Sequence, residues 1–287
     1  LSRPHPTPEE TMTYQTLNTR RDGRTLFVDF NNPPLNLINA QMIGELFDLA
    51  GSLAFDRETA VVVFGSANPE FFVAHFDLND LLRLSNDPTA PRSRYDDINV
   101  MQALATAWQI LPQVTIGVVD GICRGAGLEF ILALDMRFST PKSKFCLPEA
   151  SGGILPAGGG TTRLAMLIGP ARAREVILSS RDFTGDEAAA YGFVNRSLAR
   201  DDLNAYVNTL AHDVATRPAG SVAAVDEVIK SVFGSAVDAQ FAGFASENAA
   251  FMQLVDTPAV RESLERMAQM QDVEHERDLP AHLAAAK

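Results

Sequence analysis

Apolar positions follow two alternating patterns along the chain. Continuous apolar runs at 60–64 and 114–119 have the length of a strand, and such runs are typical of strands buried on both faces of a sheet. Around them, apolar residues recur three and four positions apart, which predicts helices from about 39 to 55 and over 96–111. Strands that alternate with helices predict an α/β fold in which helices cover both faces of the sheet.

The same pattern continues toward the C-terminus. Asn39 is a candidate N-cap for the first helix. From residue 221 onward the chain is nearly all helical in period, which favours an added subdomain for oligomerisation. We therefore predict a core over 12–200, a helical C-terminal subdomain over 201–271, and flexible tails at 1–11 and 272–287. Further strands are expected at 25–30, 71–73, 137–139 and 144–147, and further helices at 126–133, 161–168, 170–178, 186–191 and 201–215.

Composition excludes several classes of protein. The 287 residues include 24 basic and 36 acidic side chains, a net charge of −12, and 46% are hydrophobic. This apolar content supports a folded core rather than disorder, and the acidic balance argues against a nucleic-acid partner. Residues 98–119 carry no charge, but three glutamines and Pro112 interrupt the run, so we expect no membrane span.

Cysteine and histidine usage points away from disulfide and metal chemistry. Cys123 and Cys146 are the only cysteines, and neither has a partner at metal-ligand spacing. Reduced, buried thiols are the expected state, which favours a cytoplasmic location. The first eleven residues lack the apolar run of a secretory signal. The five histidines are scattered, so no metal site is predicted.

Glycine-rich segments are common in nucleotide-binding proteins, but the known nucleotide-binding motifs are absent from this sequence. The sequence contains no G-x-x-x-x-G-K-[ST] and no G-x-G-x-x-G, because Phe130 stands where the third glycine is required. No G-x-S-x-G elbow of a serine hydrolase occurs either.

The segment 118–129 remains as a candidate for chemistry. A predicted buried strand ends there, small residues at 125–127 follow, and a helix begins with Glu129 in its first turn. The N–H groups of a helix N-terminus are unpaired, and small residues leave them open to a ligand oxygen, which is the requirement of an oxyanion hole. The alternative is that the glycines only permit close packing between strand and helix.

A second carboxylate, Glu149, follows a predicted strand twenty residues later and precedes the glycine-rich stretch 152–160. Two carboxylates beside one oxyanion site are able to divide acid and base roles if their environments separate their pKa values. The alternative is two unrelated glutamates on the surface, where glutamate usually lies.

In these residues the sequence resembles the crotonase (enoyl-CoA hydratase/isomerase) superfamily, from about residue 14 to 271. The resemblance rests on V-D-G-I-C-R-G-A-G-L-E at 119–129 and on the pair Pro148-Glu149. It also rests on the block at 153–164 and on A-A-A-Y-G-F-V-N at 188–195. In combination these motifs are specific, although each alone is weak.

The resemblance implies a spiral of ββα units with a helical C-terminal region that forms a homotrimer or a dimer of trimers. It implies a hydratase that adds water across the 2,3-double bond of an acyl-CoA thioester, with no cofactor beyond the coenzyme A of the substrate. Glu129 and Glu149 match the catalytic glutamates, and the backbone N–H groups of Phe76 and Ala126 match the oxyanion hole. The residues that match substrate contacts are Ala74, His75, Asp77, Leu78 and Gly125.

The chain departs from the family pattern in the first oxyanion loop. His75 replaces glycine and Phe76 replaces alanine, so His75 is either an added polar group in the site or a loop residue without chemistry. Asn79 replaces a lysine that contacts coenzyme A in relatives. The replacements considered for that contact are Arg83, Arg92, Arg94 and Arg124. Alternatives to hydration are double-bond isomerisation, hydrolysis or lyase chemistry on a related thioester or β-dicarbonyl compound, and a binding protein without activity.

Overall fold

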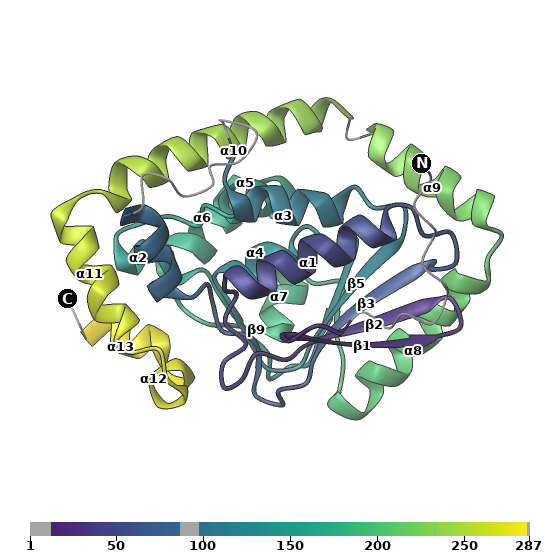
Figure 1. The fold of residues 1–287 in the computed structure, drawn as a ribbon, viewed down its shortest axis with the longest axis horizontal. Coiled ribbons are helices and arrows are strands. Elements are labelled where there is room, and N and C mark those ends of the chain that lie inside the picture. The colour runs from purple at the N-terminus through teal and green to yellow at the C-terminus, as the bar shows by residue number, and fades with distance from the viewer. Residues whose placement is uncertain (1–12, 87–97, 233, 286–287) are drawn as a thin grey trace, which may run out of the picture.

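A computed structural model describes residues 13–86, 98–232 and 234–285 (Figure 1). Its strands form two sheets, one with the order β1-β2-β3-β5-β7-β10 and a smaller one with the order β4-β6-β8-β9. The strands are β1 (Leu17–Asp22), β2 (Thr25–Phe30), β3 (Val61–Ser66), β4 (Phe71–Val73), β5 (Val114–Val119), β6 (Ile122–Arg124), β7 (Met136–Ser139), β8 (Lys144–Cys146), β9 (Phe183–Thr184) and β10 (Arg196–Ser197).

From β3 to β8, consecutive strands alternate between the two sheets. β3, β5 and β7 run parallel in the larger sheet, and the strands that follow them, β4, β6 and β8, run parallel in the smaller one. Each such pair is followed by helical structure, so the chain winds in repeated strand–strand–helix turns. The predicted α/β fold is confirmed.

The helices cover both sheets. They are α1 (Ala40–Leu53), α2 (Leu78–Asn86), α3 (Val100–Gln109), α4 (Ala126–Ile131), the 3-10 helix η1 (Pro148–Gly152), α5 (Gly160–Ile168), α6 (Pro170–Ser179), α7 (Gly185–Tyr191), α8 (Arg200–Thr216), α9 (Ala219–Val232), α10 (Gly234–Val255), α11 (Pro258–Ala268), α12 (Val273–Arg277) and α13 (Leu279–Ala285). Among the described residues, no helix combines the length and the apolar character needed to cross a bilayer.

The continuous apolar run of β3 is explained by burial on both faces. Val62 and Phe64 belong to the main core, whereas Val61 and Val63 pack in a second cluster with residues of α8. In the main core, the rings of Phe64, Trp108 and Phe130 meet edge to face. The polar boundaries also agree with expectation, because the Asn39 side chain accepts a hydrogen bond from the Met42 N–H and caps α1.

The C-terminal segment differs from the expected flexible tail. Residues 273–285 form α12 and α13, and Glu276, Leu279 and Leu283 in them are buried. Leu279 and Leu283 are four residues apart, so they share one face of α13 and bury it together. The Asp272 side chain accepts hydrogen bonds from two N–H groups of α12 and caps it. The segment 273–285 is therefore packed against the rest of the protein in spite of its polar composition.

Candidate active site

Two parallel strands of the smaller sheet bring the two glutamates to one edge. β6 and β8 pair side by side, with Arg124 opposite Cys146. Glu129 follows β6 in the first turn of α4, and Glu149 follows β8 in the first turn of η1. The charge of Glu129 contributes to a raised pKa of Glu149, as is typical of two carboxyls that share one site.

Backbone amides hold the Glu129 carboxylate. Its Oε1 accepts hydrogen bonds from the N–H of Gly158 at 2.7 Å and of Gly160 at 2.9 Å. A Cβ atom on either glycine would lie 2.7 Å from a carboxylate oxygen of Glu129. The glycine-rich loop therefore lacks side chains at these positions because the carboxylate packs directly against its backbone.

The surroundings of the two carboxyls differ. Burial raises the pKa of Glu129 to about 7, the nearby Glu247 adds to this, and the two amide hydrogen bonds oppose it. Burial, followed by the charge of Glu129, raises the pKa of Glu149 well above its usual range. Glu149 Oε2 is shielded from solvent and has no hydrogen-bond partner among the described residues. The pair thus favours an ionised Glu129 beside a protonated Glu149.

Two backbone N–H groups lie on neighbouring loops. Phe76 follows β4 and Ala126 follows β6, and these strands pair in parallel. Around Phe76, the His75 carbonyl accepts a hydrogen bond from the Ile38 N–H and the Asp77 N–H donates to the Ile38 carbonyl. Within the described part of the chain, the N–H groups of Phe76 and Ala126 donate to no acceptor. Both donors are thus available to a substrate oxygen.

Gly125 is the point where three segments of the site converge. Its φ is 47°, a left-handed conformation that favours glycine. A Cβ atom there would lie 2.9 Å from Glu149 Oε1 and 3.3 Å from the Cβ of His75. The loop of Phe76, the turn before Ala126 and the Glu149 carboxyl are therefore in contact around one residue.

Glu247 of α10 is a buried carboxylate that the sequence did not reveal. Its oxygens accept hydrogen bonds from the N–H of Gly159, the N–H of Thr162 and the amide of Gln102. Glu247 is 4% exposed. Glutamates on helices usually face water, so the helical pattern of α10 carried no signal for this position.

Comparison with known proteins follows from this geometry. The sequence model of the enoyl-CoA hydratase/isomerase family matches residues 21–277. The chain belongs to this family. The crotonase resemblance and the crotonase-like fold with a helical C-terminal region are thereby confirmed.

Individual relatives agree with this assignment. A crystal structure of a "putative enoyl-CoA hydratase" from Streptomyces avermitilis superimposes with a TM-score of 0.84 at 34% identity, covering 95% of this chain and 98% of that one. The "putative enoyl-CoA hydratase/isomerase YngF" of Bacillus subtilis (strain 168) is 29% identical over 87% of this chain and 93% of that protein. A "probable enoyl-CoA hydratase" of Mycobacterium avium (strain 104), echA17, is 31% identical over 74% of this chain and 80% of that protein.

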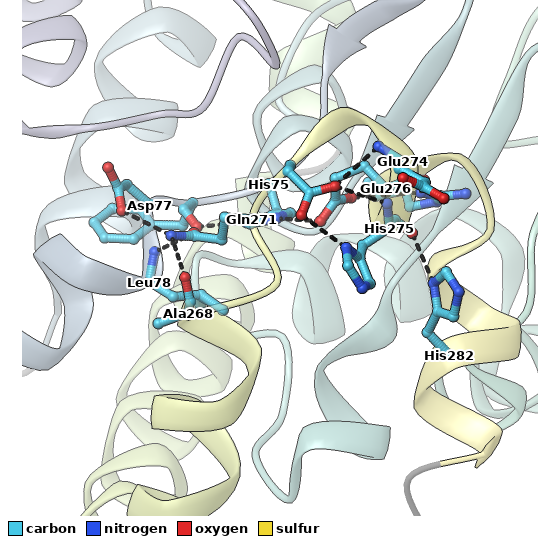
Figure 2. Close-up of polar contacts among 12 residues, drawn as sticks. His75, Asp77, Leu78, Ala268, Gln271, Glu274, His275, Glu276 and His282 are labelled. Atoms are coloured by element: carbon cyan, nitrogen blue, oxygen red, sulfur yellow. Dashed lines mark hydrogen bonds and ion pairs between the residues drawn. The ribbon is translucent and has the colours of Figure 1, made fainter.

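His75 is the clearest departure from the family pattern, and the structure gives it a role that neither earlier interpretation included. Its backbone φ is not positive, so the position makes no demand for glycine. Its Nε2 lies 2.8 Å from Oε1 of Glu276 (Figure 2). Its Nδ1 lies 2.6 Å from the carbonyl oxygen of Phe76. His75 is thus a buried partner of the C-terminal helix α12.

The other predicted substrate contacts are divided between the core and the surface of α2. Ala74 is fully buried, and its N–H donates to the Leu35 carbonyl. Asp77 and Leu78 stand at the start of α2, where both contact the side chain of Gln271 (Figure 2). The C-terminal segment therefore packs directly against the loop that carries Phe76.

The arginines considered for coenzyme A are placed differently. Arg124 is fully buried and paired with Asp182, at 2.8 Å in both hydrogen bonds, so the interpretation of Arg124 as a phosphate contact is wrong. Arg83 is exposed and pairs with Asp80 on the same helix. Arg92 and Arg94 lie outside the described residues. The physical reason for the error is that the partly exposed Asp182 pairs with the buried Arg124 guanidinium, which sequence spacing alone does not show.

Proposed function

We propose that this member of the family is a hydratase that adds water across the 2,3-double bond of an acyl-CoA thioester. The observation that carries the proposal is the pairing of Glu129, held by two amides, with a Glu149 whose buried oxygen has no partner among the described residues. Hydration needs one group that takes a proton from water and another that gives one to carbon. These two carboxyls have opposite environments at one edge of a sheet.

The proposed reaction uses each group once. Glu129 takes a proton from water, and the hydroxyl forms a bond to C3. Electrons of the double bond shift toward the thioester oxygen, where the N–H groups of Phe76 and Ala126 stabilise the enolate-like charge. The proton of Glu149 then forms the bond to C2. Proton exchange with solvent returns Glu129 to its ionised form and Glu149 to its protonated form.

We also infer that the protein assembles as a homotrimer or a dimer of trimers. Support comes from α9, where Val225, Val228 and Ile229 are each more than half exposed and lie on one helix. Exposed apolar residues gathered in this way are typical of surfaces that a partner covers. Light scattering coupled to gel filtration measures the mass, and a monomer at micromolar concentration contradicts this inference.

The test of function is hydration of crotonyl-CoA by the purified protein, followed by the loss of the ultraviolet absorbance of the conjugated thioester. Activity that disappears in both Glu129→Gln and Glu149→Gln supports hydration. Activity of the wild type only as double-bond migration, lost in Glu149→Gln but retained in Glu129→Gln, favours an isomerase instead. Absence of both reactions, together with no binding of an acyl-CoA, rejects the proposal.

A further inference from the structure

Glu276 of α12 touches both loops that carry the candidate amide donors. Its carboxylate Oε1 lies 2.8 Å from Nε2 of His75, the residue before Phe76. Its Oε2 lies 3.6 Å from Nη1 of Arg124, two residues before Ala126, and its carbonyl oxygen accepts a hydrogen bond from the same guanidinium group. Glu276 is 1% exposed, so these contacts are shielded from water. Figure 2 shows the His75 contact.

The hydrogen bonds of His75 define its charge. One ring nitrogen faces a carbonyl oxygen and the other a carboxylate oxygen, and both of these groups only accept hydrogen bonds when the carboxylate is ionised. Beside an ionised carboxylate, the imidazole therefore carries a proton on each nitrogen. Burial alone lowers the pKa of His75, but the charge of Glu276 and the two hydrogen bonds outweigh burial and raise it.

Two cations and two anions form the centre of this group. His75 and Arg124 are the cations that face Glu276, and Asp182 binds Arg124 from the far side through two hydrogen bonds. Lys144 of β8 lies 3.7 Å from Asp182 at the edge of the group. Because a buried ion pair is costly when one partner is lost, each member fixes the position of the others.

We propose that Glu276 is a positioning residue that sets the spacing between the Phe76 and Ala126 amides. It holds β4's loop through His75 and the end of β6 through Arg124, so the C-terminal helix braces both halves of the oxyanion hole. The kinetic part of this inference rests on the proposed hydratase function, whereas the structural part does not. Relatives with glycine in place of His75 lack this means of connecting the loop to the C-terminus.

The test compares Glu276→Gln with Glu274→Gln, a change of an exposed glutamate on the same helix. We expect kcat for crotonyl-CoA to fall about ten- to hundred-fold in Glu276→Gln, because displaced donors stabilise the transition state poorly. KM is expected to stay within about threefold of the wild type, since ground-state binding uses the rest of the substrate. Glu274→Gln is expected to match the wild type in both constants.

A second measurement does not depend on activity. Hydrogen exchange is followed by mass spectrometry at the bonded amides next to the two donors: the Asp77 N–H, which donates to the Ile38 carbonyl, and the Gly125 N–H, which donates to the Cys146 carbonyl. Exchange at both is expected to accelerate in Glu276→Gln but not in Glu274→Gln. Exchange in β3 serves as the reference for global stability. If Glu276→Gln does not fold, Glu276→Asp is used instead. This variant keeps the negative charge on a side chain that is one methylene shorter, and it is expected to produce the same effects with smaller magnitude.

The outcomes separate the two proposals. An active wild type with unchanged kcat and unchanged exchange in the Glu276 variants overturns the positioning role and leaves hydration intact. A wild type that does not hydrate any enoyl-CoA overturns the proposed function, and the exchange measurement then decides the positioning role alone. Equal acceleration of exchange in β3 and in both loops also overturns it, because that result describes general destabilisation.

Discussion

Glu129 and Glu247 share the amides of one glycine-rich loop. Glu129 accepts from Gly158 and Gly160, and Glu247 accepts from Gly159 between them. Two buried carboxylates that approach the same backbone from different helices repel each other, and this repulsion contributes to the raised pKa of Glu129. α10 therefore influences the acidity of a residue on α4 through a segment of three residues.

This relationship predicts a shift of the pH profile in Glu247→Gln. Glu129 must be ionised to act as a base, so activity is expected to fall as the pH drops through about 7, the pKa of Glu129. Removing the charge of Glu247 lowers that pKa, so kcat/KM is expected to persist to lower pH than in the wild type. The control is Glu265→Gln, on an exposed position of α11.

The same variant is expected to lose stability. An amide nitrogen replaces one carboxylate oxygen, and the N–H of Gly159 or of Thr162 is left without an acceptor, which costs about 1–3 kcal/mol. Urea denaturation measures the loss. An acid limb at the same pH in wild type and Glu247→Gln contradicts the assigned coupling.

Glutamine substitutions of the two catalytic candidates are both expected to lose activity, but only the substitution of Glu129 is expected to lose stability. Glu129→Gln and Glu149→Gln each remove a proton-transfer group, so kcat is expected to fall by roughly a hundred- to ten-thousand-fold. Glu149→Gln replaces a carboxyl that is already neutral near neutral pH, so its unfolding free energy is expected to stay close to that of the wild type. Glu129→Gln weakens two charge-assisted hydrogen bonds and is expected to unfold more easily.

Thermal unfolding of both variants, with Glu265→Gln as the surface control, separates loss of chemistry from loss of fold. Full hydratase activity in either glutamine variant contradicts the assigned roles. A destabilised Glu149→Gln beside a stable Glu129→Gln reverses the protonation states that we infer.

The sequence predicts the half of the site that follows strands. Glu129 follows the predicted strand at 114–119 and the small residues at 125–127, and Glu149 follows the predicted strand at 144–147. The strand β6 was not predicted, and its parallel pairing with β8 brings the two glutamates together. Glu247 and Glu276 escape prediction for the opposite reason. Their partners are distant in sequence, 201 positions in the case of His75 and Glu276, and nothing in a helical pattern specifies a contact of that kind.

The error at the C-terminus has the same origin. Residues 272–287 are polar enough to predict a flexible tail. The sequence shows which residues are charged, but it does not show which of them form ion pairs in the folded chain. Glu276 is neutralised by His75 and Arg124, and only the folded chain shows this. The interpretation of Arg124 as a ligand contact failed for the same reason. Its partner Asp182 lies 58 positions away in the sequence, so their ion pair could not be recognised from the sequence.

Gly158 is expected to tolerate no side chain. A Cβ atom there would lie 2.7 Å from Glu129 Oε2 and 3.2 Å from the Cβ of Met101, and its φ adds no backbone strain. Gly158→Ala is therefore expected to displace the Glu129 carboxylate and lower kcat by about a hundredfold, because misplacement of a catalytic group by about 1 Å has that cost.

The matched control is Gly44→Ala, at an exposed position within α1 where a Cβ atom has no neighbour within 4 Å. Since alanine favours a helix over glycine by about 1 kcal/mol, this variant is expected to be more stable and fully active. Equal activity of the two alanine variants contradicts the close packing of the loop against Glu129.

The His75–Glu276 pair is expected to make stability depend on pH. The pKa of His75 is raised above its ordinary value of 6.5 in the folded protein, so the pair contributes stability below that value and loses it as the pH rises through the folded pKa. His75→Ala removes one partner of a buried ion pair, so it is expected to cost about 3–5 kcal/mol at low pH, where the pair is charged. This cost is expected to shrink as the pH rises above 6.5.

The comparison uses urea denaturation below and above this pH, with His212→Ala, a change of an exposed histidine on α8, as the control. A cost of His75→Ala that stays constant with pH, or one that grows toward alkaline pH, contradicts a charged His75 in the folded chain.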